Sequence, residues 1–155
     1  MTKESFEKQV LLLADTMYRV SAMLLRRAED QKDAVQSCLL KAWDRRGQLR
    51  EESKFRFWVM RILVNECHTL LRKSRNMVLI DAPEQTVEPV NFALRQSVEG
   101  LPLKLREVVA LHYMEGLSVE DVAQILHLPG GTVKSRLSRA RTLLRKTWQD
   151  EEERA

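Results

Sequence analysis

Apolar residues recur at steps of three and four along most of the chain, and this spacing is the feature that most restricts its fold. Near the N-terminus the stripe consists of Phe6, Val10, Leu13, Met17, Val20 and Leu24. The same spacing predicts further helices from about Lys32 to Arg45 and from about Lys54 to Ser74. Only five Gly and four Pro occur among 155 residues, of which 44% are hydrophobic. We therefore expect an all-α fold with a buried core.

The helical pattern fails after Asn76, where two prolines and several acidic residues replace it. A segment of this composition is typical of a tether between domains. We therefore predict two small helical domains, residues 1–76 and 90–155, joined by a flexible linker at residues 77–89.

The C-terminal part carries the signature of two helices joined by a tight turn. A helix that opens near Leu101 is expected to end at Gly116. Ser118 and Asp121 have the spacing of a capping box, which predicts the start of a short helix. We expect a final helix to begin at Thr132. Such a pair is a helix-turn-helix, whose second helix lies in the major groove of DNA.

The final helix separates apolar from basic side chains. On one side, which we expect to pack inward, lie Val133, Leu137, Ala140 and Leu144. The other side is rich in basic and hydroxyl residues, and no acid occurs from Pro129 to Lys146. Small hydroxyl side chains let a helix approach the groove floor, while arginine binds guanine edges and lysine holds phosphate. The predicted DNA-binding residues are Thr132, Lys134, Ser135, Arg136, Ser138 and Arg139.

The helix expected from Lys54 to Ser74 also has two dissimilar sides. Its apolar side holds Phe55 and Trp58, which we expect to pack in the core. The opposite stripe consists of Phe57, Arg61, Asn65, His68 and Arg72. Unpaired bases are bound by stacking on aromatic rings and by hydrogen bonds from such polar side chains. We predict that this stripe binds one strand of opened DNA.

The final helix also has a simpler interpretation, a solvent-exposed amphipathic helix whose outer face binds nothing. That interpretation explains neither the turn before Thr132 nor the absence of acids from Pro129 to Lys146. The net charge of the whole chain is only +4, so its clustering rather than its size favours a nucleic-acid partner.

No pattern typical of catalysis or metal binding occurs in the chain. Cys38 and Cys67 lie in apolar helical patterns without the spacing of a zinc site, so we expect two buried free thiols. We find no phosphate-binding loop and no nucleophile beside a base, and we expect neither an enzyme nor a cofactor or metal. No apolar run reaches the roughly 18 residues needed to span a bilayer, and the N-terminus is too polar for a signal peptide. We expect a cytoplasmic protein.

Two groups of motifs resemble a known family. The stretches Asp33-Ala-Val-Gln36 to Trp43 and Phe55-Arg-Phe-Trp58 to Asn65 resemble region 2 of bacterial sigma factors. The stretches from Leu101-Pro102 to Ser118 and from Gly131 to Arg141 are similar to region 4. No segment corresponds to the additional domains of housekeeping sigma factors, so the chain resembles the small extracytoplasmic-function (ECF) class of the sigma-70 family.

That resemblance implies a protein that binds core RNA polymerase, directs it to promoters through minus-35 and minus-10 elements, and promotes DNA opening. In the family, region 2 docks on the beta-prime coiled coil of the polymerase and region 4 meets the beta flap. The residues nominated for polymerase binding are Asp33, Gln36, Leu40 and Trp43. The loop from Arg45 to Ser53 and the helix after it correspond to the part that captures a flipped minus-10 base, with Arg61 and Asn65 at motif positions. The final helix corresponds to the minus-35 reader.

The family also implies an anti-sigma factor as a partner, although no residue identifies one. The sequence departs from the family motifs at Ser37 and Cys38, where an acid and a larger apolar residue are usual, and at Gly130, which we expect to loosen the start of the final helix. The alternative function is a stand-alone helix-turn-helix regulator with an N-terminal dimerisation or sensing domain.

Overall fold

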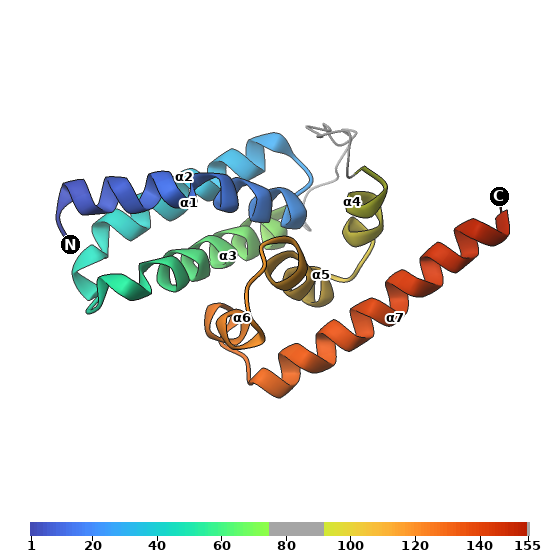
Figure 1. Cartoon of the computed structure of the whole chain (residues 1–155). Helices are drawn as coiled ribbons and strands as arrows, with labels where there is room; N and C mark the ends of the chain where they lie inside the picture. The colour runs from blue at the N-terminus through green and yellow to red at the C-terminus, as the bar shows by residue number, and fades with distance from the viewer. Residues whose placement is uncertain (75–91, 155) are drawn as a thin grey trace. The chain divides into compact units, whose positions relative to one another are not determined.

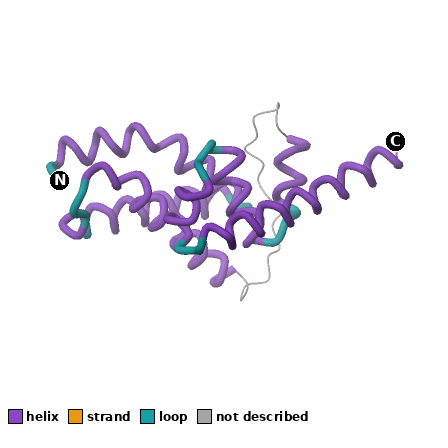
Figure 2. The backbone as a smooth tube through the Cα atoms, turned by 60° about the horizontal axis from the view of Figure 1, so that its bottom comes forward, coloured by secondary structure: helices purple, strands orange, loops and turns teal. Residues whose placement is uncertain are grey.

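A computed structural model describes residues 1–74 and 92–154, and all regular structure within these ranges is helical (Figure 2). This confirms the predicted all-α class. The chain divides into two units, Met1–Gln85 and Thr86–Ala155 (Figure 1). The linker predicted at residues 77–89 lies outside the described residues, and the limits predicted for the two domains stay a prediction.

The first unit is a bundle of three helices, α1 (Lys3–Leu24), α2 (Ala28–Asp44) and α3 (Phe55–Ser74), each packed against the other two. The predicted apolar stripe of α1 is buried except for Val10, which is half-buried. The largest fully buried side chains of this unit are Phe55, Met17, Met60, Leu63, Val20, Val59 and Val64. Burial of one face of each helix stabilises the bundle, because short helices are marginal in water on propensity alone.

Helix α2 begins four residues earlier than the sequence predicts, at Ala28 rather than Lys32. Glu29 and Asp30 lie in its first turn, where negative charge complements the helix dipole. The buried Gln31 donates from Nε2 to the carbonyl oxygen of Leu25 at 3.0 Å, which ties the new helix to the end of α1. These polar contacts start the helix before its apolar period begins, so the period alone misplaced the start.

A connecting loop, Arg45–Ser53, joins α2 to α3. It contains one 3-10 turn at Arg46–Gln48, and a second turn, Glu52–Lys54, leads into α3. Between the two turns, residues 49–51 have extended or bent backbone. The loop is therefore ordered at its two ends by local hydrogen bonds.

The second unit contains α4 (Phe92–Glu99), α5 (Leu103–Val109), α6 (Val119–Leu126) and the long α7 (Gly130–Arg154) (Figure 1). A π-helical turn, Ala110–Met114, continues α5. Helices α4, α5 and α6 all pack against α7. The core consists mainly of Val98, Leu105, Val108, Leu111, Val122, Ile125, Val133 and Leu137.

The turns of this unit follow the predicted chemistry. Gly116 has φ +70°, a left-handed conformation that glycine adopts without strain, and it lies just after the π-helical turn. The hydroxyl oxygen of Ser118 accepts from the backbone N–H of Asp121 at 3.1 Å, which confirms the cap of α6. His127 then ends α6 in a left-handed conformation, with φ 54°. The short helix and the tight turn after it are therefore present.

Helix α7 begins at Gly130, not at Thr132 as the sequence predicted. The carbonyl oxygen of Pro129 accepts from the backbone N–H groups of both Thr132 and Val133, at 3.0 and 3.2 Å. Those bonds place both glycines in the first turn of the helix. The predicted start at Thr132 was therefore wrong, whereas the expectation that Gly130 loosens the start of α7 stays a prediction.

Candidate nucleic-acid interface

The final helix presents the two faces that the sequence predicted. Val133, Leu137, Ala140 and Leu144 are buried against the rest of the second unit, which confirms the inward face. Four of the predicted DNA-binding residues are exposed on the other side: Lys134, Ser135, Ser138 and Arg139. The remaining two, Thr132 and Arg136, are half-buried. The structure therefore leaves this basic and hydroxyl-rich face open to a partner, and the DNA-binding roles stay a prediction.

Not every basic residue of α7 is directed outward. Arg141 donates from its guanidinium to the hydroxyl oxygen of Tyr113, at 2.5 Å, and so contacts the π-helical turn. Further along, Trp148 donates from Nε1 to the hydroxyl of Ser97 on α4 at 3.2 Å. These two contacts fasten α7 to the π-helical turn and to α4 within the second unit.

Helix α3 buries the apolar side that the sequence identified. Phe55 is 1% exposed, and its ring centroid lies 5.6 Å from that of Phe6 in an edge-to-face arrangement. Trp58 is only half-buried, so the prediction that it packs in the core is confirmed only in part. Of the predicted stripe, Asn65 and Arg72 are exposed, whereas Phe57, Arg61 and His68 are half-buried.

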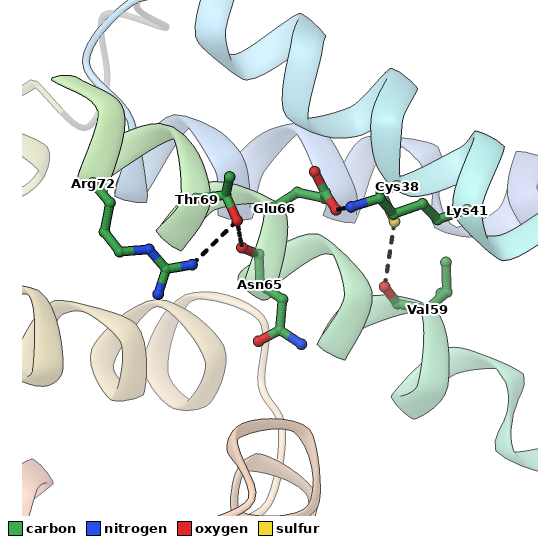
Figure 3. A network of polar contacts seen from close by, with 7 residues as sticks. All are labelled: Cys38, Lys41, Val59, Asn65, Glu66, Thr69 and Arg72. Atoms are coloured by element: carbon green, nitrogen blue, oxygen red, sulfur yellow. Dashed lines mark hydrogen bonds and ion pairs between the residues drawn. The ribbon is translucent and has the colours of Figure 1, made fainter.

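Polar contacts along α3 orient part of this stripe (Figure 3). The guanidinium of Arg72 donates to the hydroxyl oxygen of Thr69 at 3.3 Å, and that hydroxyl donates to the backbone carbonyl of Asn65 at 3.1 Å. Figure 3 shows the Asn65 side chain pointing away from α2. The amide of Asn65 and the guanidinium of Arg72 thus lie along one line of the helix, where both can donate hydrogen bonds.

Glu66 lies beside Asn65 but points the opposite way, toward α2, where it forms an ion pair with Lys41 (Figure 3). The Glu66 side chain is 11% exposed and that of Lys41 is 47% exposed. A carboxylate this deeply buried requires a charged partner, because its own desolvation is costly. The pair therefore fixes α3 against α2.

Both cysteines lie in the core of the first unit as free thiols, as predicted. The Cys38 thiol lies 3.4 Å from the backbone carbonyl of Val59 (Figure 3). Burial raises the pKa of the Cys38 thiol well above its usual range, and the nearby Glu66 carboxylate adds to the effect. The thiol therefore stays protonated and acts as a packing residue. Within residues 1–74 and 92–154, no three His, Cys, Asp or Glu side chains form a group that could hold a metal ion.

Helix α2 presents a third candidate surface on its outer side. Asp33, Gln36 and Leu40 are exposed, and Leu40 is 68% exposed. The opposite side of the helix is buried and includes Ala34, Val35, Cys38 and Ala42. A single exposed leucine is common on protein surfaces and does not by itself mark a binding site. The structure thus brings three of the four residues nominated for polymerase binding onto open surface.

Trp43, the fourth of these residues, is half-buried and held on two sides. Its ring centroid lies 5.1 Å from that of Phe6, edge to face. The guanidinium carbon of Arg46 lies 3.7 Å from the Trp43 ring centroid, and an Arg46 N–H donates to the Trp43 carbonyl at 2.8 Å. Arg46 was not among the site residues predicted from the sequence. Its spacing three residues after a tryptophan at a helix end is the signal that could have found it.

None of the helices within residues 1–74 and 92–154 combines the length and the apolar character required to cross a membrane.

Comparison with known proteins identifies the family. Residues 10–77 match Sigma-70 region 2, and residues 91–144 match Sigma-70, region 4. ECF RNA polymerase sigma factor SigM of Mycobacterium tuberculosis is 33% identical over 83% of this chain and 69% of SigM. RNA polymerase sigma-H factor of Pseudomonas aeruginosa is 28% identical over 95% of this chain and 88% of that protein.

A solved structure agrees with this result. The sigma factor RpoE of Bartonella quintana, crystallised with the anti-sigma factor NepR, superposes with a TM-score of 0.79 at 27% identity, over 96% of this chain and 98% of that one. The chain belongs to the ECF class of the sigma-70 family. It is therefore a transcription initiation factor that binds core RNA polymerase and promoter DNA. The comparisons support this interpretation and not the alternative of a stand-alone regulator.

Proposed function

We propose that the outer faces of α7 and α3 read two different states of promoter DNA while α2 binds the polymerase. The observation that carries this proposal is that two separate units each present a basic, polar outer face opposite a buried apolar one. One face suits paired strands and the other suits an unpaired strand. The predicted domain limits, 1–76 and 90–155, give each unit one of these tasks.

The outer face of α7 suits the major groove at the minus-35 element. Ser135 and Ser138 are small and exposed, so the helix backbone can lie close to the base edges. Arg139 has the planar guanidinium that pairs with the two acceptors of a guanine edge, while Lys134 and Arg136 suit phosphates at the groove walls. Thr132 lies in the first turn, where hydroxyls and backbone N–H groups contact phosphate.

The stripe on α3 suits an unpaired strand at the minus-10 element. A flipped base requires a stacking surface and hydrogen-bond donors and acceptors for its edge. Phe57 offers the ring, Asn65 offers both a donor and an acceptor, and Arg61, His68 and Arg72 offer hydrogen bonds or charge for the strand. The favourable contacts with an extruded base offset part of the cost of unstacking it.

The exposed side of α2 suits a helical partner on the polymerase. Leu40 offers apolar surface, and Asp33 and Gln36 offer polar contacts at its rim. Binding to the polymerase brings both units to the same promoter, so two individually weak DNA contacts act together. We therefore expect weak, strongly salt-dependent DNA binding by the free protein.

Other parts of this proposal concern surroundings and partners. The factor acts in the cytoplasm, where bacterial RNA polymerase works, and the polymerase alone supplies catalysis. An anti-sigma factor that holds the free protein is suggested by the Bartonella quintana complex, in which a related sigma factor is bound to one.

Run-off transcription with purified core polymerase on a genomic fragment library tests the main function. Adding the protein should produce new, discrete start sites that core polymerase alone does not use. If the start sites are unchanged and the protein does not associate with core polymerase, the proposal is wrong.

The strand-reading stripe has its own test. The double variant Arg61→Ala and Asn65→Ala should bind core polymerase normally and yet reduce promoter opening, followed by permanganate reactivity of unpaired thymines. Arg56→Ala is the matched control, since Arg56 is an exposed basic residue of α3 outside the stripe. Equal opening by the double variant and the control would remove the stripe from the mechanism.

A further inference from the structure

Arg46 connects two surfaces that the proposed function treats separately. It is the first residue of the 3-10 turn in the connecting loop, and its guanidinium covers the ring of Trp43 at the end of α2. The same guanidinium donates to the Trp43 carbonyl at 2.8 Å. One side chain therefore contacts both the polymerase-binding residue and the backbone from which the loop departs.

The connecting loop is anchored at its far end as well. The hydroxyl of Ser5 on α1 donates to the carboxylate of Glu52 at 3.0 Å. Between the anchors, Gly47, Gln48 and Arg50 are exposed, and nothing lies within 4 Å of a Cβ placed on Gly47. The two ends of the loop are thus anchored, and the residues between them are exposed. This arrangement suits a segment that binds a ligand, because little further ordering of the backbone is needed on binding.

We propose that Arg46 is a positioning residue that couples polymerase binding at Trp43 to the geometry of the connecting loop; this inference rests on the proposed function. When the polymerase covers Trp43, it removes water from the contact between guanidinium and ring. A cation over an aromatic face is held more tightly once it is desolvated. The start of the loop is then fixed, and the loop is ready for an extruded base when the promoter opens.

The chemistry of the contact favours arginine. A planar guanidinium lies flat on the indole while it still donates a hydrogen bond to the carbonyl, whereas a lysine ammonium is a compact and strongly hydrated charge that cannot do both equally well. The coupling therefore depends on shape as well as on charge. This separates it from a general attraction between the loop and DNA phosphates.

The experiment compares Arg46→Ala and Arg46→Lys with the control Arg26→Ala, which removes the same charge from an exposed residue outside the connecting loop and the α3 stripe. Each variant is assembled with saturating core polymerase, and the rate of promoter opening is followed with a 2-aminopurine base in the minus-10 element. We expect Arg46→Ala to slow opening about fivefold, Arg46→Lys to slow it nearly as much, and Arg26→Ala to slow it less than twofold.

Two results would overturn the proposal. One is opening by Arg46→Ala at the rate of the unaltered protein. The other is equal slowing by Arg46→Ala and Arg26→Ala, which would mean that the loss of any positive charge has the same effect. Hydrogen exchange at Gln48 and Leu49 adds a structural readout, and it should become faster in Arg46→Ala holoenzyme. Exchange at these amides that matches the unaltered holoenzyme contradicts the proposed anchoring.

The double variant of Arg61 and Asn65, measured in the same assay, separates this inference from the proposed function. If that variant opens promoters normally, the assignment of the α3 stripe fails whatever Arg46 does. If it is defective and Arg46→Ala is not, the stripe stands and the role of Arg46 is wrong.

Discussion

Helices α3 and α7 both carry a basic outer face, but their surroundings differ. Helix α3 lies against both other helices of its unit, so three of its five candidate residues are half-buried. On α7, four of the six candidate residues are exposed. A helix that enters a duplex groove must project from its support, whereas an unpaired strand can follow a surface bounded by neighbouring elements. The degree of exposure therefore agrees with the two proposed targets.

The outer face of α7 and the stripe on α3 also differ in the size of their side chains. The middle of the α7 face carries Ser135 and Ser138, which leave room for base edges to approach the helix. The α3 stripe carries an aromatic ring and longer polar groups, which are the kinds of side chain that bind unpaired bases.

The largest expected effect comes from unfolding one of the two units while the other stays folded. Phe55→Ala removes a buried ring from the core of the first unit and should cost about 3 to 5 kcal/mol of its stability. Urea unfolding followed by hydrogen exchange should show lost protection in α3 and unchanged protection in α7. Leu137→Ala is the matched variant, since Leu137 is buried in the second unit. Equal loss of protection in both units with Phe55→Ala would contradict their independence.

A smaller effect sharpens the role of the α7 face. Arg139→Ala should weaken binding by about 1 to 3 kcal/mol if its guanidinium pairs with a guanine. The loss should appear with the preferred upstream sequence and vanish when that base pair is changed, as measured by holoenzyme binding to promoter variants. An equal loss on every sequence would assign Arg139 to phosphate instead.

The ion pair between Lys41 and Glu66, which joins α2 to α3, is the subject of the next prediction. Lys41→Met leaves the Glu66 carboxylate buried without its partner and should destabilise the first unit by about 1 to 2 kcal/mol, less than for a fully buried pair because Lys41 is half exposed. The exchanged pair, Lys41→Glu with Glu66→Lys, should recover part of this loss. Urea unfolding measures both, and a stable Lys41→Met protein would show that the pair contributes little.

The smallest expected effect concerns the first turn of α7. Gly130 lies inside the helix, its φ is not positive, and an added Cβ would meet nothing within 4 Å. Gly130→Ala should therefore stabilise the second unit by about 0.4 to 1 kcal/mol by restricting the unfolded chain. Thermal unfolding would reveal it as a higher Tm, and a lower Tm would indicate that the turn needs glycine at this position.

The sequence predicted those features that depend on a repeating pattern. The inward face of α7 and the apolar stripe of α1 follow from helical period, and the cap at Ser118 follows from local spacing. The starts of α2 and α7 were misplaced because local hydrogen bonds at Gln31 and Pro129, not apolar residues, fix them.

Contacts between residues that are distant in the sequence could not be predicted from helical period or local spacing. Lys41 and Glu66 are 25 residues apart and meet only because α2 packs on α3. The partial exposure of Trp58 likewise depends on how the bundle closes, since period alone places it on the apolar side. The stack of Arg46 on Trp43 depends on the direction in which the chain leaves α2.

The burial of Cys38 and Cys67 has a practical consequence. Because these are the chain's two cysteines and both are hidden in the core, a cysteine introduced at an exposed position of either unit should react far faster with a maleimide dye than the native pair. Donor and acceptor fluorophores attached in this way would report the separation of the two units, before and after the polymerase binds, without any change to the native thiols.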